Sequence, residues 1–212
     1  MNMPSTSEAI LSRRARKKER TRGQIYAAAM ELFLARGYDA VTIEEICAAA
    51  DVARGTFFLH FPSKDSLLGE YGRQAFAELV ALLDAHTASA VDALDLALRF
   101  LAERASRHAA VVRLVVRETA VSPAAITATT AAGRDLTDLF AAIIRRGQRT
   151  GELRRSVQPV VAGAVIASAY LAIAGEWARH EQTPELAVLV HQALDVILRG
   201  ISRNPRRAEK QP

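Results

Sequence analysis

The sequence predicts an all-α fold of about nine helices, with a three-helix N-terminal domain followed by a larger helical domain. Apolar residues recur at the i, i+3, i+4 spacing of amphipathic helices along most of the 212 residues. Prolines precede several long apolar segments and glycines follow others, which is the order expected for helix starts and ends. No segment shows the two-residue alternation that indicates a β-strand.

The N-terminal segment is strongly basic. Residues 1–15 are expected to form a disordered arm, and seven basic residues and one acidic residue lie between Arg13 and Arg22. Such a run is either a solvated tail or, directly before a DNA-binding motif, an arm that contacts phosphates. The first helix is expected over residues 17–36, ended by Gly37.

Residues 41–68 form the most informative segment, because they predict two short helices separated by a tight turn. Thr42 followed by Glu45 forms a capping box at the start of the first of these helices. Asp51 and Val52 end it, and the second helix is expected over residues 53–60. Two short helices with a turn of this size are typical of a helix-turn-helix, whose second helix enters the DNA major groove.

The segment from Ile25 to Leu68 resembles the DNA-binding domain of the tetracycline-repressor-like (TetR/AcrR) family of transcriptional regulators. The residues that carry the resemblance are Ala29, Leu32, Phe33, Gly37, Tyr38, Thr42, Ile46, Ala50, Val52, Gly55, Thr56, Phe58, His60, Phe61, Ser63, Lys64 and Leu67. Beyond this segment the resemblance is architectural. It implies a DNA-binding domain over residues 16–65, an effector-binding and dimerisation domain over 66–202, and a disordered basic tail over 203–212.

Three positions depart from the family pattern. Asp51 stands where the turn usually has glycine, and aspartate tolerates the left-handed backbone at modest cost. Ala53 replaces the usual Ser or Thr cap of the recognition helix, so one capping hydrogen bond is absent. Phe58 replaces the usual tyrosine and therefore removes one expected phosphate contact.

The resemblance and the position of each side chain predict the DNA contacts. These residues are Thr42, Arg54, Gly55, Thr56, Phe58, His60 and Lys64. Thr42 and Lys64 lie at helix N-terminal ends, which favour phosphate. Arg54 opens the recognition helix, where it either binds guanine bidentately or holds a phosphate. His60 is either a backbone anchor or a neutral surface residue.

In the larger domain, helices are expected over residues 66–86, 91–107, 109–120, 123–151, 159–180 and 184–200. The family resemblance implies that they enclose a cavity for a small, largely apolar effector. Candidate apolar walls are Phe76, Leu79, Leu83, Phe100, Phe140, Ile144 and Tyr170, and Arg113 and Arg117 are candidates to contact a polar group of the ligand. Each of these residues could instead serve only core packing or face water.

The last two expected helices are apolar over more than one narrow stripe, which indicates burial on more than one side. In the family, two such helices meet their symmetry mates in a four-helix bundle. The resemblance therefore implies a homodimer. The candidate dimerisation residues are Ala164, Ser168, Leu171, Leu186, Val190, Leu194 and Ile197.

No enzyme site is expected, because the sequence has no phosphate-binding glycine loop and no nucleophile motif. Glu176 with His180, and His191 with Asp195, are each four residues apart, but two ligands do not make a metal site. We expect neither a metal nor a cofactor. The predicted function is a repressor that a small effector releases from a palindromic operator in double-stranded DNA. Alternatives are an activator of the same fold, a ligand-blind architectural DNA-binding protein and, least favoured, an enzyme using the cavity.

Composition supports an anionic partner and a cytoplasmic location. The net charge is +5, and a single cysteine, Cys47, excludes an intrachain disulfide, as suits a reducing compartment. The N-terminus lacks the apolar region of a signal peptide. Residues 156–175 contain no charge over about the length of a membrane span, but they are rich in Ala, Gly and Ser, so a buried helix is favoured and no membrane partner is expected.

Overall fold

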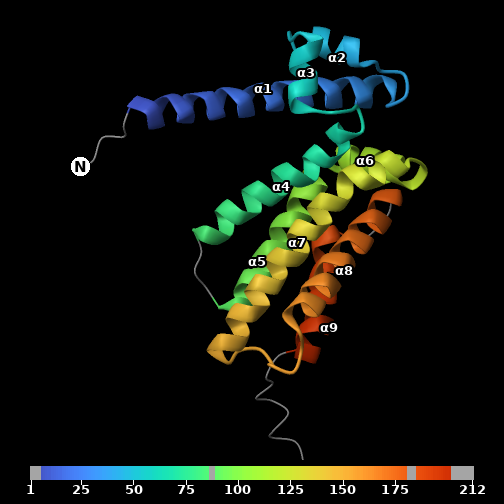
Figure 1. The fold of residues 1–212 in the computed structure, drawn as a ribbon. Coiled ribbons are helices and arrows are strands. Elements are labelled where there is room, and N and C mark those ends of the chain that lie inside the picture. The colour runs from blue at the N-terminus through green and yellow to red at the C-terminus, as the bar shows by residue number, and fades with distance from the viewer. Residues whose placement is uncertain (1–5, 86–88, 181–184, 202–212) are drawn as a thin grey trace, which may run out of the picture. The chain divides into compact units, whose positions relative to one another are not determined.

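The computed structural model describes residues 6–85, 89–180 and 185–201, and these residues form helices joined by short connections (Figure 1). The helices are α1 (Thr6–Arg36), α2 (Ile43–Ala49), α3 (Arg54–His60), α4 (Ser66–Asp84), α5 (Ala90–Arg107), α6 (Ala109–Val121), α7 (Pro123–Thr150), α8 (Pro159–Arg179) and α9 (Leu186–Ile201). No strand occurs within those ranges, so the predicted all-α class is confirmed.

Helix α1 is longer than the sequence prediction. It begins at Thr6, whereas the expected helix began at residue 17, so residues 6–15 are helical and not a disordered arm. The physical reason is composition: this stretch has no glycine or proline and contains the good helix formers Ala, Arg, Leu and Glu. Residues 1–5 and the predicted tail at 203–212 lie outside the described residues.

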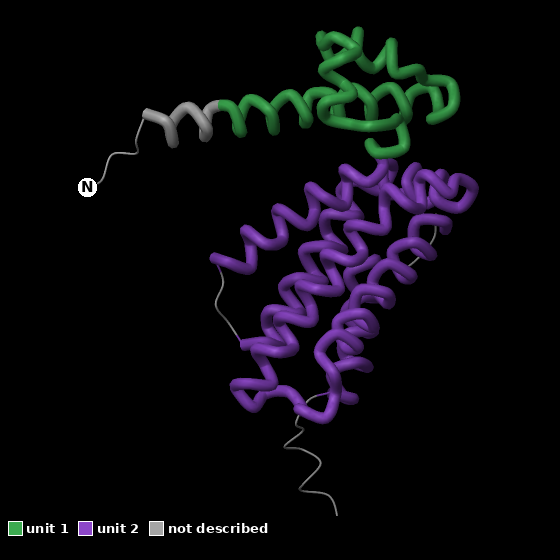
Figure 2. The backbone as a smooth tube through the Cα atoms, viewed as in Figure 1, with its two compact units in different colours: residues 1–67 green, residues 68–212 purple. Residues whose placement is uncertain are grey.

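The chain divides into two compact units, residues 1–67 and residues 68–212 (Figure 2). The division falls two residues after the predicted domain boundary. The first unit is built around buried side chains of α1, α2 and α3 and of the connections between them. These are Ile25, Ala29, Met30, Phe33, Tyr38, Val41, Ile46, Cys47, Phe57 and Phe61.

The second unit is a bundle in which α7 packs along α8, and α9 packs against α5 and α8. Very close approach of α7 and α8 is possible because Gly163 has no side chain. A Cβ atom at this position would lie 2.5 Å from the carbonyl oxygen of Thr137 and 2.7 Å from the backbone nitrogen of Ala141. Proline starts both helices, as the sequence predicts, and α7 is followed by Gly151 in the left-handed conformation.

Helix α8 is the one helix in the described part of the chain that is long and apolar enough to cross a membrane. Length and composition alone are weak evidence for such a span, because a core helix of a water-soluble protein meets the same criterion. In this structure one side of α8 is buried against the bundle, with Ala162, Ile166, Ala167 and Tyr170 among its covered residues.

Candidate functional site

The turn and caps of the helix-turn-helix follow from local sequence. The Thr42 backbone N–H donates to Glu45 Oε2 at 2.8 Å, and the Glu45 N–H donates to Thr42 Oγ1 at 3.2 Å, which completes the predicted capping box. The backbone hydrogen bond from Thr42 and the ion pair with Arg36 lower the pKa of Glu45 to about 2. Asp51 adopts a φ of +52°, the left-handed conformation expected there, and Ala53 provides no side-chain cap for α3.

Helix α3 has one buried and one exposed side. Phe57 is fully buried and packs against Phe61, with ring centroids 5.9 Å apart. Phe58 lies on the other side and is 43% exposed, beside the exposed residues Arg54 and Gly55. The helix therefore presents an arginine, a glycine and an aromatic ring to solvent, while its opposite side fixes it to the domain.

Gly55 is not required by the packing of the domain. A Cβ atom at this position would meet nothing within 4 Å. Glycine inside a helix costs about 1 kcal/mol relative to alanine, and no intramolecular contact offsets that cost here. A glycine at an exposed helix position allows another molecule, such as a DNA backbone, to approach the helix closely.

Arg54 has an intramolecular partner in the free protein. Its Nη1 lies 2.8 Å from Glu44 Oε1 on α2, and its guanidinium carbon lies 5.7 Å from the centroid of the Phe58 ring. Both charged side chains are more than half exposed, so this ion pair contributes little to stability. Arg54 can therefore exchange Glu44 for a base or a phosphate at small cost.

Lys64 and His60 differ from simple phosphate anchors. Lys64 Nζ donates to the carbonyl oxygens of Tyr38 at 3.0 Å and Val41 at 3.1 Å, so two of its three protons already hold the α1–α2 connection. Burial, followed by the charges of Arg22 and Lys18, lowers the pKa of His60, which keeps its ring neutral at neutral pH. The neutral interpretation of His60 therefore fits the structure.

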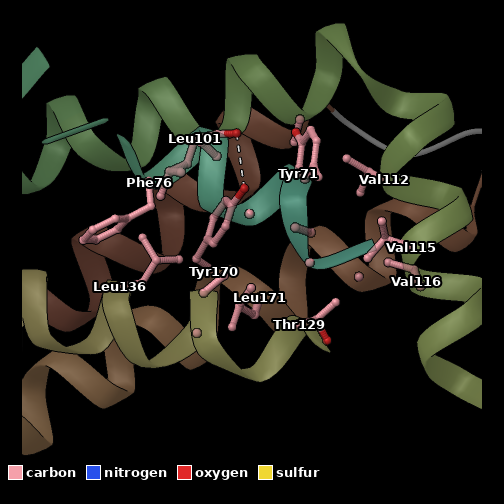
Figure 3. A pocket seen from close by; sticks show the side chains of 18 of the residues that line it. Tyr71, Phe76, Leu101, Val112, Val115, Val116, Thr129, Leu136, Tyr170 and Leu171 are labelled. Atoms are coloured by element: carbon pink, nitrogen blue, oxygen red, sulfur yellow. Dashed lines mark hydrogen bonds between the residues drawn. The ribbon is translucent and has the colours of Figure 1, made fainter. Parts of the chain in front are cut away.

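The second unit contains an apolar cavity of about 150 Å³ between α4, α5, α6, α7 and α8 (Figure 3). Its wall consists almost entirely of apolar and small residues. They are Leu68, Gly69, Tyr71, Gly72, Ala75, Phe76, Leu101, Ala105, Val112, Val115, Val116, Thr129, Ala132, Gly133, Leu136, Tyr170, Leu171, Ala174 and Gly175.

Two of the nine predicted ligand-contacting residues, Phe76 and Tyr170, line this cavity. The other predictions are wrong for this cavity. Leu79, Phe140 and Ile144 are buried in the core, Leu83 and Phe100 pack against it, and Arg113 and Arg117 are exposed on α6. Apolar periodicity reports that a side chain is buried, but it does not distinguish burial against other side chains from burial against an empty space.

Sequence reasoning missed the small residues of the cavity wall. Gly69 and Gly72 on α4 face α7, where a Cβ at Gly72 would lie 2.6 Å from the Cβ of Ala132. A pair of glycines three residues apart within an otherwise apolar helix was the available signal, since it indicates close approach of a second element. Tyr71 on the same helix also lines the cavity and is not among the predicted ligand-contacting residues.

The predicted dimerisation residues are only partly exposed. Leu186, Val190 and Leu194 on α9 are buried within their own subunit, where α9 packs on α5 and α8, so these three predictions are wrong. Ser168 and Leu171 on α8 are exposed, whereas Ala164 and Ile197 are half-buried. The three α9 residues were assigned wrongly because a helix buried on one side and a helix buried on two sides can carry similar numbers of apolar residues.

An exposed apolar stripe nevertheless remains on these two helices, and we call it the α8–α9 stripe. Its residues lie outside the core, and on α8 they recur every three or four positions. They are Val161, Val165, Ser168 and Ala172 on α8 and Val188 and Val196 on α9. Three valines of this stripe are about half exposed, and Val196 is more exposed still.

The acidic and histidine pairs noted in the sequence are surface ion pairs. Glu176 accepts from both Arg179 and His180 on the same helix, whereas His191 contacts Asp95 on α5 and Asp195 pairs with Arg199. The described part of the chain contains no group of three or more His, Cys, Asp or Glu side chains that could hold a metal ion. Cys47 is buried, and burial raises the pKa of its thiol.

Comparisons with protein families match both units. Residues 25–71 match the family described as bacterial regulatory proteins, tetR family, and residues 87–201 match the family described as tetracyclin repressor-like, C-terminal domain. The chain is 50% identical over 54 residues to the transcriptional regulator TcmR of Streptomyces glaucescens, and 39% identical over 49 residues to the transcriptional repressor DhaR of a Mycobacterium species. These matches span about a quarter of the length of each curated relative.

Solved structures extend the similarity to most of the chain. The FadR repressor of Thermus thermophilus in complex with lauroyl-CoA is 32% identical, with a TM-score of 0.68 over 87% of this chain and 97% of that one. The SmeT–triclosan complex has a TM-score of 0.69 over 87% of this chain and 93% of that one. At 21% identity, SmeT supports the fold alone.

Proposed function

Because the chain belongs to the TetR family of bacterial regulatory proteins, we propose that it is a DNA-binding transcriptional regulator that represses transcription until a small, largely apolar effector releases it from its operator. The observation that carries this proposal is the exposed side of α3. It combines Arg54, an unencumbered Gly55 and Phe58 on a helix that Phe57 fixes to its domain from the opposite side.

The proposed DNA-binding form is a homodimer assembled through the α8–α9 stripe. This stripe places several half-exposed valines on two neighbouring helices, and their burial against a second copy would be favourable. A dimer of this kind brings two α3 helices to successive major grooves, about 34–36 Å apart along the DNA, which matches a palindromic operator.

Effector control rests on the cavity and on helix α4. FadR of Thermus thermophilus was solved with lauroyl-CoA bound, which supports a small-molecule effector for this chain too. Helix α4 begins at Ser66, at the end of the DNA-binding unit, and contributes Tyr71 and Phe76 to the cavity wall. A ligand that fits one arrangement of α4 better than another would shift the population of DNA-binding conformations.

The apolar cavity also favours the proposed function over the two alternatives, a ligand-blind architectural protein and an enzyme. A ligand-blind architectural protein has no need of an apolar cavity beneath the helix that begins at the DNA-binding unit. Neither the cavity wall nor the described acidic and histidine residues assemble a catalytic group, which favours a regulator over an enzyme. We place the protein in the cytoplasm, where its DNA partner is found.

Arg54→Ala tests whether α3 contacts DNA bases. If Arg54 binds guanine, the variant loses about 1–3 kcal/mol of binding free energy at one base position and loses its preference there. Affinity would be measured against a set of single-base operator variants at fixed salt concentration, because the phosphate contribution depends strongly on salt. A uniform loss for all operator variants would instead assign Arg54 to the phosphate backbone.

Glu44→Gln is the matched control for this experiment. It removes the partner that holds Arg54 in the free protein without touching Arg54 itself. If the ion pair competes with DNA, this variant binds the operator at least as tightly as the wild type. Weaker binding by Glu44→Gln would mean that Glu44 positions Arg54 and does not compete for it.

A further inference from the structure

The polar groups of the cavity wall differ in whether their hydroxyl proton is already donated within the protein. Tyr170 lies in the wall, and its hydroxyl donates a hydrogen bond to the backbone oxygen of Leu101 at 3.2 Å (Figure 3). Thr129 donates to the backbone oxygen of Ala125 at 3.0 Å, within its own helix. Both donors are therefore used inside the protein. The remaining polar side chain of the wall, Tyr71, interacts with the guanidinium of Arg104. Because a guanidinium can only donate, this interaction uses the Tyr71 oxygen and leaves the hydroxyl proton available.

The buried cation of Arg104 lies next to the Tyr71 ring. Arg104 is 4% exposed, and its guanidinium carbon lies 4.5 Å from the centroid of the Tyr71 ring. Its Nε and Nη2 contact the carboxylate of Glu78 at 3.0 and 3.3 Å, whereas its Nη1 is buried and has no hydrogen-bond partner among the described residues. Leu101 and Ala105, on the same helix as Arg104, belong to the cavity wall.

The protonation states of Arg104, Tyr71 and His108 keep a positive charge next to the part of the cavity that Tyr71 lines. Burial alone would lower the pKa of Arg104, but the hydrogen bond to Glu78 and the proximity of Tyr71 outweigh it and raise the pKa, so the cation persists. Burial raises the pKa of Tyr71, so its hydroxyl stays protonated and can donate. Burial and the charge of Arg104 lower the pKa of His108, whose ring contacts Tyr71 edge to face.

Glu78 does not cancel this charge fully. Its side chain is half exposed and therefore solvated, whereas Arg104 is buried on the protein side. Charges interact more strongly in such a poorly polarisable environment than in water.

The size of the cavity limits the apolar part of a ligand. An apolar cavity of about 150 Å³ can hold a single benzene ring. A long acyl chain would require the helices to move apart. The cavity in this state therefore fits one ring or a short branched chain.

We propose that the effector is a compact apolar carboxylate, such as a monocyclic aromatic acid, whose ring fills the cavity and whose carboxylate meets the Tyr71 hydroxyl under the charge of Arg104. This inference rests on the proposed function, because it takes the cavity as the effector site. Tyr71 is the residue that touches the ligand, and Arg104 acts through it as a specificity-determining positioning residue.

The test is calorimetric titration of the full chain with benzoate, toluene and dodecanoate. The wild type is expected to bind benzoate more tightly than toluene or dodecanoate. Arg104→Met is expected to lower benzoate affinity about 10- to 100-fold, the effect of losing an interaction with a charged group. Toluene affinity should be unchanged, because toluene has no group for Arg104 to attract.

Glu78→Gln provides the opposite change. It removes the carboxylate that competes for Arg104 and is expected to raise benzoate affinity. Glu78→Gln still tests the assignment if Arg104→Met fails to fold. Unchanged or weaker benzoate binding by Glu78→Gln would overturn the assignment. Equal losses of benzoate and toluene binding in Arg104→Met, or dodecanoate as the tightest wild-type ligand, would also overturn it.

Operator binding by the same proteins separates this inference from the proposed function. Sequence-specific DNA binding without any benzoate binding would overturn the carboxylate assignment and leave the DNA-binding regulator intact. Benzoate binding without sequence-specific DNA binding would support the assignment of the ligand and overturn the proposed function.

Discussion

Val165→Glu is expected to give a folded monomer that no longer binds a palindromic operator tightly. Val165 is 49% exposed at the centre of the α8–α9 stripe, so a glutamate there is solvated in the monomer. In the dimer the same carboxylate would be buried without a partner, which is strongly unfavourable. Losing the second, linked DNA contact would reduce operator affinity by about 10²- to 10⁴-fold.

Light scattering and operator titration measure the two parts of this result. Ala142→Glu is the matched control, because it adds the same charge to an exposed position of α7 outside the stripe. It should leave both the dimer and operator affinity unchanged. A normal dimer of Val165→Glu would contradict the assignment of the interface to the α8–α9 stripe.

Leu194→Glu is expected to unfold the larger unit rather than to separate two folded subunits. Leu194 is 2% exposed within its own subunit, in the core that α9 forms with α5 and α8. Removing a buried leucine side chain costs about 2–5 kcal/mol in free energy of unfolding, and burying a carboxylate in its place adds to that cost. Urea unfolding followed by circular dichroism would measure the loss.

Leu194→Met controls for the position itself, because it conserves volume and polarity and should cost less than about 1.5 kcal/mol. Protein concentration must be held constant throughout, since dimerisation contributes to apparent stability. If Leu194→Glu were instead a stable folded monomer, Leu194 would face the partner subunit and its burial within the subunit would be wrong.

The sequence was most informative where a local rule fixes a local structure. The Thr42–Glu45 capping box, the left-handed Asp51 and the end of α1 at Gly37 are each determined by a few neighbouring residues, and the structure confirms all three. The resemblance to a known DNA-binding domain likewise rests on side chains within one short segment. Helix boundaries in the larger unit agree with the predictions to within a few residues for the same reason.

The cavity and the interface depend on packing between distant segments, so periodicity alone could not locate them. Phe140 and Tyr170 both lie on the buried, apolar sides of their helices, yet only Tyr170 borders the cavity. Leu194 and Val165 both contributed to the apolar character of the last two helices, but only Val165 is exposed. The role of Lys64 as a clamp on two carbonyl groups also needed the path of the α1–α2 connection.

Selection of bound DNA from a random pool by the wild-type protein tests the central claim most directly. A dimer with two α3 reading heads should recover an inverted repeat, with half-site centres about 34–36 Å apart or at a multiple of that distance. Titration of the recovered sequence should then show one dimer per site and an affinity well above that for unrelated DNA. Recovery of no common sequence, with equal affinity for all DNA of the same length, would contradict the proposed operator-binding regulator and favour the architectural alternative.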